Sequence, residues 1–363
     1  MTYKILLTGA GFSHNFGLPL ANDVWGMVFN NSKIQTSREI RNELLKEYNY
    51  EKLYSEILVE EKFSPERDCF LERINIIFND IFEALTIKAF DSNFGVSYKD
   101  IRSFILMIVG KNFDEGFLFT TNQDLLLERI FIENRKGNKG IASPHIGNCL
   151  WNFEGNDPKT APCPLKNTIA VLRNSPYFKG EESFLPTKKK INEDKGRKSG
   201  SVPYYKLHGS IGWKKKNIDS TKLPIVMGTN KSKLINSEPL FTEYFNILEQ
   251  ALFNGNSALL VIGYSFSDKH INEKILKGIQ EFGLKVHVIN PCAIQDFIDD
   301  ITKKEKLDKN AYILLSKLHG YYQATLKDIF PVEYEEKFPD MTSGYICSQS
   351  EIWQQLRDNF FGT

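Results

Sequence analysis

A glycine turn near the start of the chain carries the first residues that could do chemistry. Residues 9–11 read Gly-Ala-Gly after the apolar run 3–8, and Ser13 adds a hydroxyl group. Glycine lets a ligand approach the backbone closely. The run 20–29, after Pro19, has a helical pattern. A strand, a glycine turn and a helix together predict a phosphate site, because a helix N-terminus presents unpaired N–H groups and a positive dipole end.

A dinucleotide is the first ligand to consider, but the fingerprint of ordinary dehydrogenases is incomplete. That fingerprint is G-x-G-x-x-G. Gly9 and Gly11 fit it, while His14 stands at the third glycine position. The structural alternative is a tight strand-to-helix turn that holds no ligand.

Polar side chains also follow other strand-like runs, namely 116–121, 202–207, 258–262 and 284–289. The carboxyl ends of parallel strands share one edge of a sheet, where open α/β folds bind ligands. Amide, carboxylate, hydroxyl and imidazole groups are therefore expected beside the phosphate turn. These residues are Asn122, Gln123, Asp124, His208, Ser210, Ser265, Asp268 and Asn290.

Each of these residues also has a structural interpretation. Asn122 and Asp124 are good helix caps, and for Asp268 the cap is the favoured interpretation. A single histidine such as His208 is more often a hydrogen-bonded structural residue than a base. His270 has no partner at an informative spacing, and neither do His145, His287 and His319, so none of these four is assigned a role.

Strands alternating with helices predict an α/β fold with a Rossmann-like, mostly parallel sheet. The expected catalytic domain covers residues 1–300. It contains a helical insertion at about 32–113 and a variable surface insertion at about 152–201. The lysine-rich stretch within the latter is interpreted as a solvated loop rather than a nucleic-acid site. Residues 301–363 are expected to form a helical C-terminal segment.

Composition excludes several classes of protein. The 363 residues carry a net charge of +1, with 41% hydrophobic and 13% aromatic residues, which is typical of a soluble globular protein. No apolar run is long enough to span a bilayer. The N-terminus enters a strand at once, so no signal peptide is expected. Five scattered cysteines without a C-x-x-C pair argue against disulfides and structural zinc, and favour the cytoplasm.

Several motifs in order along the chain resemble those of the sirtuin family. The first is Gly9-Ala10-Gly11-x-Ser13, continued by Gly17-Leu18-Pro19. It is followed by Thr121-Asn122-Gln123-Asp124 and by His208-Gly209-Ser210. The last are Gly263-Tyr264-Ser265 and Asn290. The resemblance covers roughly residues 3–31 and 114–292.

This resemblance implies roles for individual residues. Asn122, Asp124 and His208 would be catalytic. Gly9, Ala10, Gly11, Ser13, Thr121, Gly263, Ser265 and Asn290 would bind NAD.

The chain departs from sirtuin deacylases in three respects. It lacks the zinc ribbon of two C-x-x-C pairs, it has Leu20-Ala21-Asn22-Asp23 where Phe-Arg is usual, and it shows no recognisable groove for an acyl-lysine peptide. What remains resembles the bacterial sirtuin-like NADases of anti-phage defence, which often carry G-Y-S-x-x-D as at 263–268.

The resemblance implies an NAD⁺ hydrolase that releases nicotinamide and ADP-ribose, with NAD as substrate and no metal. Positive charge develops on the ribose during this cleavage, as in glycoside hydrolysis. Protein ADP-ribosylation or deacylation, and an NAD or ADP-ribose sensor without turnover, are the alternatives. A homo-oligomer is expected, with a possible partner protein in trans such as a HerA-type ATPase. Nucleic acid would be reached only through a partner, and no membrane is involved.

Overall fold

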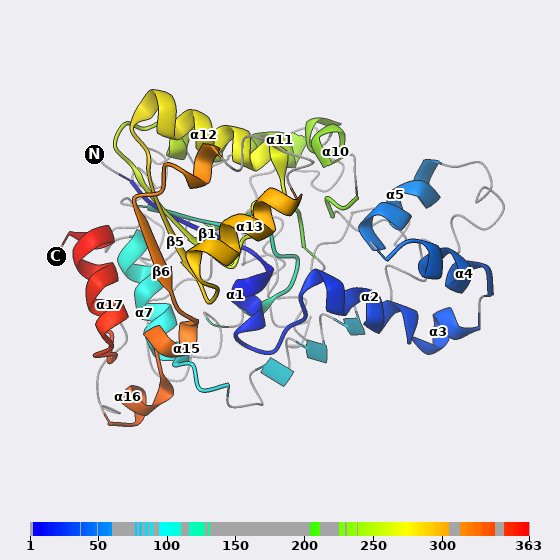
Figure 1. The fold of residues 1–363 in the computed structure, drawn as a ribbon, viewed down its shortest axis with the longest axis horizontal. Helices are drawn as coiled ribbons and strands as arrows, with labels where there is room; N and C mark the ends of the chain where they lie inside the picture. The colour runs from blue at the N-terminus through cyan, green and yellow to red at the C-terminus, as the bar shows by residue number, and fades with distance from the viewer. Residues whose placement is uncertain are drawn as a thin grey trace, which may run out of the picture.

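The fold is seen in a computed structural model (Figure 1). It describes residues 3–36, 38–48, 50–59, 94–109, 116–127, 204–210, 225–228, 231–237, 239–304, 313–337 and 345–362, together with single positions at 77–89 and 130. The predicted surface insertion at 152–201 lies outside these residues, as does most of the part of the predicted helical insertion between 60 and 93.

Six parallel strands form one sheet in the order β3-β2-β1-β4-β5-β6. This is the Rossmann-like order, so the predicted α/β fold class is confirmed. The strands are β1 (Lys4–Thr8), β2 (Gly116–Thr120), β3 (Tyr204–Lys206), β4 (Ala258–Ile262), β5 (Lys285–Asn290) and β6 (Gly320–Gln323).

The central strands form because their side chains are apolar on both faces. Every residue of β2 is buried, and so are the last four residues of β1 and of β4. Near-continuous apolar runs of this kind are typical of parallel strands covered by helices on both sides. Thr8 is paired in register with Thr120 and Ile262, so β1, β2 and β4 end at the same level.

Helices cover both faces of the sheet (Figure 1). Apolar residues of α11, α12 and α13 pack with Ile5 and Leu7 of β1 on one face. Residues of α7, α15 and α17 pack with Leu6 on the other. These helices are α7 (Tyr98–Val109), α11 (Pro239–Leu252), α12 (Lys269–Phe282), α13 (Ile294–Lys304), α15 (Leu326–Ile329) and α17 (Glu351–Leu356).

Helices α2 to α5 share a separate small hydrophobic core. Val24, Val28, Leu44 and Leu53 are buried together there, and Figure 1 shows α2 to α5 extending to the right of the sheet. The helices are α2 (Ala21–Phe29), α3 (Ser32–Gln35), α4 (Arg38–Lys46) and α5 (Tyr50–Val59). The helical pattern predicted for 20–29 and for the described part of 32–59 is thereby confirmed.

Three features differ from the sequence-based expectations. A short helix, α1 (Ala10–His14), begins directly at the glycine turn, before Pro19. The apolar run 223–227 also predicts a short strand, but its described part forms one antiparallel bridge between Gly209 and Ile225 and no strand of the sheet. β6 was not anticipated, and it pairs with β5 after the last strand that was expected.

The remaining helices are short or peripheral, and none of the described helices is long and apolar enough to cross a membrane. The C-terminal residues are tied to α7, because the carboxylate of Asp100 accepts the backbone N–H groups of Cys347 at 2.7 Å and Ser348 at 2.9 Å. The other helices are α10 (Lys231–Ser237), α16 (Val332–Lys337) and a final π-helical turn, Arg357–Phe361.

Candidate functional site

The switch point of the sheet lies between β1 and β4, where the strand order reverses and open α/β folds bind ligands. Two glycine turns meet there. The N–H of Gly9 donates to the carbonyl of Ile262 at 3.0 Å, and that of Gly11 to the carbonyl of Gly263 at 2.9 Å. The glycines thus bring the two strand ends into direct contact. The backbone N–H groups of Gly9 and Gly11 are therefore both used in bonds to the second turn. Ala10, between them, is exposed.

Asn122, Ser13 and Asp124 form a buried network against the first glycine turn. The side-chain amide of Asn122 donates to the carbonyl of Gly9 at 2.8 Å and to the hydroxyl of Ser13 at 2.9 Å. Ser13 donates in turn to Asp124 at 2.8 Å. The structure therefore brings together two residues expected to be catalytic and two expected to bind NAD. Both N–H bonds of the Asn122 amide are used, and its carbonyl oxygen remains as the acceptor.

Hydroxyl groups hold the ends of β1 and β2 together beneath this network. Thr8 donates to Thr120 at 2.8 Å, and the backbone N–H of Asn122 donates to the Thr120 hydroxyl at 3.0 Å. The backbone N–H of Thr121 donates to the carbonyl of Thr8 at 3.0 Å. Asp124 also accepts the N–H of Leu126 at 2.9 Å, so the capping role considered for Asp124 coexists with its bond to Ser13.

Lys206 is a buried residue of this edge that sequence reasoning missed. It ends β3, is 0% exposed, and its ammonium group donates to the backbone carbonyl of Asp124. The bond joins the end of β3 to the turn after β2. A lysine inside an otherwise apolar strand run was the available signal, because lysine is almost never fully buried unless it is paired.

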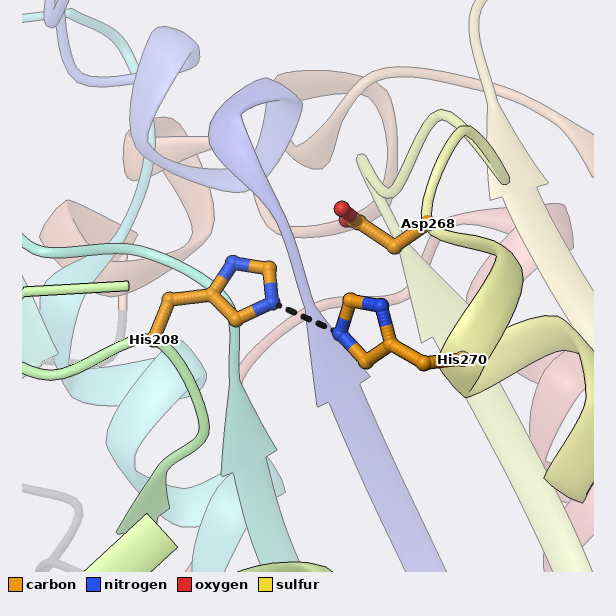
Figure 2. A group of neighbouring side chains, drawn as sticks. All are labelled: His208, Asp268 and His270. Carbon is orange, nitrogen blue, oxygen red and sulfur yellow. Dashed lines mark hydrogen bonds between the residues drawn. The ribbon is translucent and has the colours of Figure 1, made fainter. Parts of the chain in front are cut away.

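His208 lies in a second polar cluster, with Asp268 and His270 (Figure 2). The Nε2 atoms of the two histidines are 3.2 Å apart. His208 follows β3, while His270 lies in the first turn of α12 and Asp268 precedes that helix. One nitrogen of each histidine and one carboxylate oxygen of Asp268 lie within 4.8 Å of one another. His270 had been left without a role, since its partner is distant in sequence.

The favoured interpretation of Asp268 as a helix cap is wrong for its side chain. The residue stands at the N-cap of α12, but its carboxylate makes no capping hydrogen bond. It pairs instead with Lys231, whose Nζ is 3.0 Å from Asp268 and 3.0 Å from Glu51 of α5. This pairing connects α5 to the histidine cluster.

Burial determines the charge of the cluster. It lowers the pKa of His208 to about 3 and that of His270 to about 4, against the attraction of Asp268 in both cases. Burial would raise the pKa of Asp268, but electrostatic attraction by His208, Lys231 and His270 lowers it to about 2, and Lys231 is the only one of these three that is charged at neutral pH. At neutral pH the cluster therefore holds two neutral imidazoles and one carboxylate, which is paired with Lys231.

Two imidazoles and a carboxylate form a donor set that transition metals accept. In this cluster, however, the carboxylate of Asp268 already has the ammonium of Lys231 as its partner. Lys231 bonds one oxygen of that carboxylate, so a metal ion held by all three side chains would have to bind close to the ammonium group and against its positive charge. The cluster is thus arranged primarily as a hydrogen-bonded ion pair.

Other residues expected to bind NAD lie along the same edge without joining either cluster. Ser265 is exposed and shares a hydrogen bond of 2.7 Å with Ser267. Asn290 ends β5, and its side chain accepts the N–H of Cys292 at 2.9 Å. His14 was not among the residues expected to bind NAD, and one nitrogen of its ring lies 3.0 Å from the carbonyl oxygen of Leu18.

The described surface also contains a hollow of about 500 Å³ beside the end of α11, lined by Asn246, Glu249, Gln250, Phe253 and Asn254. Because β4 begins after this segment, the hollow lies toward the amino ends of the strands. It is therefore separate from both polar clusters.

Comparison with protein families gives one finding. A family profile described as SIR2-like domain matches residues 116–315, which is more than half of the chain. The matched region includes Asn122, Asp124, His208, Asp268 and His270. No curated protein matches the chain.

Proposed function

Because the chain belongs to the family of SIR2-like domains, which bind and process NAD, we propose that it is an NAD⁺ hydrolase. It cleaves the bond between nicotinamide and ribose and releases nicotinamide and ADP-ribose. The first glycine turn and the turns after β2, β4 and β5 hold the dinucleotide, through Gly9, Ala10, Gly11, Ser13, Thr121, Gly263, Ser265 and Asn290. Support comes from the sheet order, which sets the glycine turns at the switch point.

The reaction adds one water molecule to NAD⁺. As the C1′–N bond breaks, its electron pair goes to the cationic nicotinamide, which leaves as a neutral molecule, and positive charge develops on the ribose. Water attacks C1′ and loses a proton. We assign the base to His208, and the positioning of a ribose hydroxyl or the water to the carbonyl oxygen of Asn122. The carboxylate of Asp124 lies near the developing charge or the nicotinamide carboxamide.

The observation that carries this proposal is the pair of hydrogen bonds from Asn122 to Gly9 and Ser13. They attach a proposed catalytic amide directly to the proposed phosphate turn. A helix cap alone would not require the Asn122 side chain to contact a turn more than 100 residues earlier in the chain. A ligand site that combines phosphate binding with reaction at a nearby sugar would use such a link.

The test is NAD⁺ consumption by the purified protein, with nicotinamide and ADP-ribose quantified. We expect Asn122→Ala and His208→Ala each to lower kcat by about 100-fold or more, the scale of a positioned acid–base group. Asn254→Ala, at the opposite edge, is the matched amide control and should retain wild-type turnover. Wild-type turnover in Asn122→Ala and His208→Ala, as in the control, would reject the site assignment. Tight NAD binding without turnover, with or without candidate activators, would favour a sensor.

We further propose that NAD depletion by this enzyme serves anti-phage defence in the cytoplasm. Support comes from the G-Y-S-x-x-D segment and from the missing zinc ribbon. Such an enzyme must be inactive until triggered. The helical insertion and a C-terminal segment from about residue 301 would provide that control through homo-oligomerisation or a partner in trans such as a HerA-type ATPase.

A further inference from the structure

Building on the proposed hydrolase, we propose that His270 is a positioning residue for His208. Its Nε2 accepts a hydrogen bond from Nε2–H of His208, which leaves Nδ1 of His208 unprotonated and available as the base. Asp268 supports this arrangement by orienting His270.

The contact between the two rings is close, and its geometry is fixed. The Nε2 atoms are 3.2 Å apart, which is hydrogen-bond distance. The ring of His270 also packs against Phe245 of α11, with ring centroids 5.3 Å apart. His208 itself is 4% exposed. A rotation of the His208 ring would break the bond and leave a buried polar nitrogen without that partner.

The direction of the bond follows from Asp268. A neutral imidazole carries one N–H and one lone pair. In Figure 2 the ring edge of His270 that bears its second nitrogen faces the carboxylate of Asp268. This negative charge favours the N–H on that side, at Nδ1. Nε2 of His270 then has the lone pair and must accept the proton of His208 Nε2.

The second nitrogen of His208 is consequently a free base. Figure 2 shows it turned away from His270, and no described residue makes a hydrogen bond to it. Burial disfavours the imidazolium that forms when this nitrogen takes a proton, and the neighbouring groups act on that cation with opposite signs. His270 accepts one N–H, and the charge of Asp268 favours the cation while Lys231 opposes it. A third group that sets the tautomer of a catalytic histidine is the logic of the serine-protease triad.

The experiment compares His270→Ala with His270→Gln, whose amide can place an acceptor near the former Nε2. His319→Gln, at the amino end of β6, is the matched histidine control. Nitrogen-15 NMR of the histidine rings, assigned with His208→Gln, gives the tautomer of His208. We expect Nε2–H in the wild type and in His270→Gln, and a tautomer mixture in His270→Ala.

Kinetics provide the second readout. We expect kcat of His270→Ala to fall by about 100-fold, the lower end of an acid–base contribution, with KM for NAD⁺ nearly unchanged. His270→Gln should recover most of the loss, and thermal unfolding shows whether each variant is folded.

A proton on Nδ1 of His208 in the wild type, or an unchanged tautomer in His270→Ala, would overturn the positioning role. A wild-type protein that never turns over NAD⁺ would reject the hydrolase instead. The tautomer measurement would still decide the role of His270 in that case.

Discussion

At the scale of single residues, Gly263 shows how little space separates the two glycine turns at the carboxyl ends of β1 and β4. It follows β4 with a φ of +66°, and a Cβ atom at this position would collide with the backbone of Gly11 and Phe12. Gly9 is similarly restricted, because its Cβ would lie 2.6 Å from the carbonyl oxygen of Gly263. The two turns can meet only if neither carries a side chain. Glycine is therefore required here for packing, whatever ligand the edge binds.

Gly263→Ala should therefore destabilise the protein strongly. Left-handed backbone costs an L-residue about 1–2 kcal/mol, and the collision adds about 1–3 kcal/mol. Gly362→Ala is the matched control, because it has a φ of +70° and no atom within 4 Å of the added Cβ. Chemical denaturation measures both. Equal losses of stability would show that contact between the turns is unimportant.

At the scale of elements, one ion-pair chain joins the helical insertion to the histidine cluster. Lys231 of α10 contacts Glu51 of α5 and Asp268 before α12, and its side chain is 19% exposed. Burial lowers the pKa of Lys231, but the two carboxylates raise it and prevail. The lysine thus stays charged. A movement of α5 would change the field at His208 and His270, which gives the insertion a physical route to the site.

Lys231→Met should leave two carboxylates without their cation and cost about 3–5 kcal/mol, the usual loss when one partner of a buried pair is removed. Because the Lys231 charge lowers the pKa of His208 and of Asp268, both pKa values should rise. The acidic limb of the NADase pH profile would then move to higher pH. Lys269→Met is the control, since the Lys269 side chain is 67% exposed and 3.8 Å from Glu273. An unshifted acidic limb in Lys231→Met would contradict the coupling.

At the scale of the whole molecule, two buried histidines and the half-buried His270 make stability depend on pH. Burial lowers the pKa of His208 to about 3, and those of His270 and His287 to about 4, from 6.5 in each case. The unfolded chain therefore binds these protons at higher pH than the folded chain does. Stability is complete above about pH 6.5 and falls as the pH drops toward 4.

Thermal unfolding between pH 7.5 and pH 4 should show this loss of stability. The melting temperature is expected to fall steadily below about pH 6.5. His287→Gln removes the one of these three histidines that lies in β5. This variant should therefore show a shallower dependence of the melting temperature on pH. His14→Gln is the control, and its melting temperature should depend on pH as that of the wild type does, since the His14 side chain is exposed. A melting temperature independent of pH down to about 4 would contradict the assignment of neutral, buried imidazoles.

The sequence by itself determined the strands at the centre of the sheet. β1, β2, β4 and β5 coincide with apolar runs, because parallel strands buried on both faces need apolar side chains throughout. The edge strand β6 has the short sequence Gly-Tyr-Tyr-Gln, with one buried residue, and so offered no such signal. The start of α1 was missed because a helix of five residues has too few apolar positions to show a period.

The sequence also singled out Asn122, Asp124 and His208 as candidates, because they are polar residues that follow strand-like runs. Only the tertiary structure decided their partners. The hydrogen bond between His208 and His270 spans 62 residues, and the pairing of Asp268 with Lys231 spans 37. Contacts between separate elements leave no periodicity in the chain. They arise because a parallel sheet brings its carboxyl ends to one edge, where burial selects which polar groups must pair.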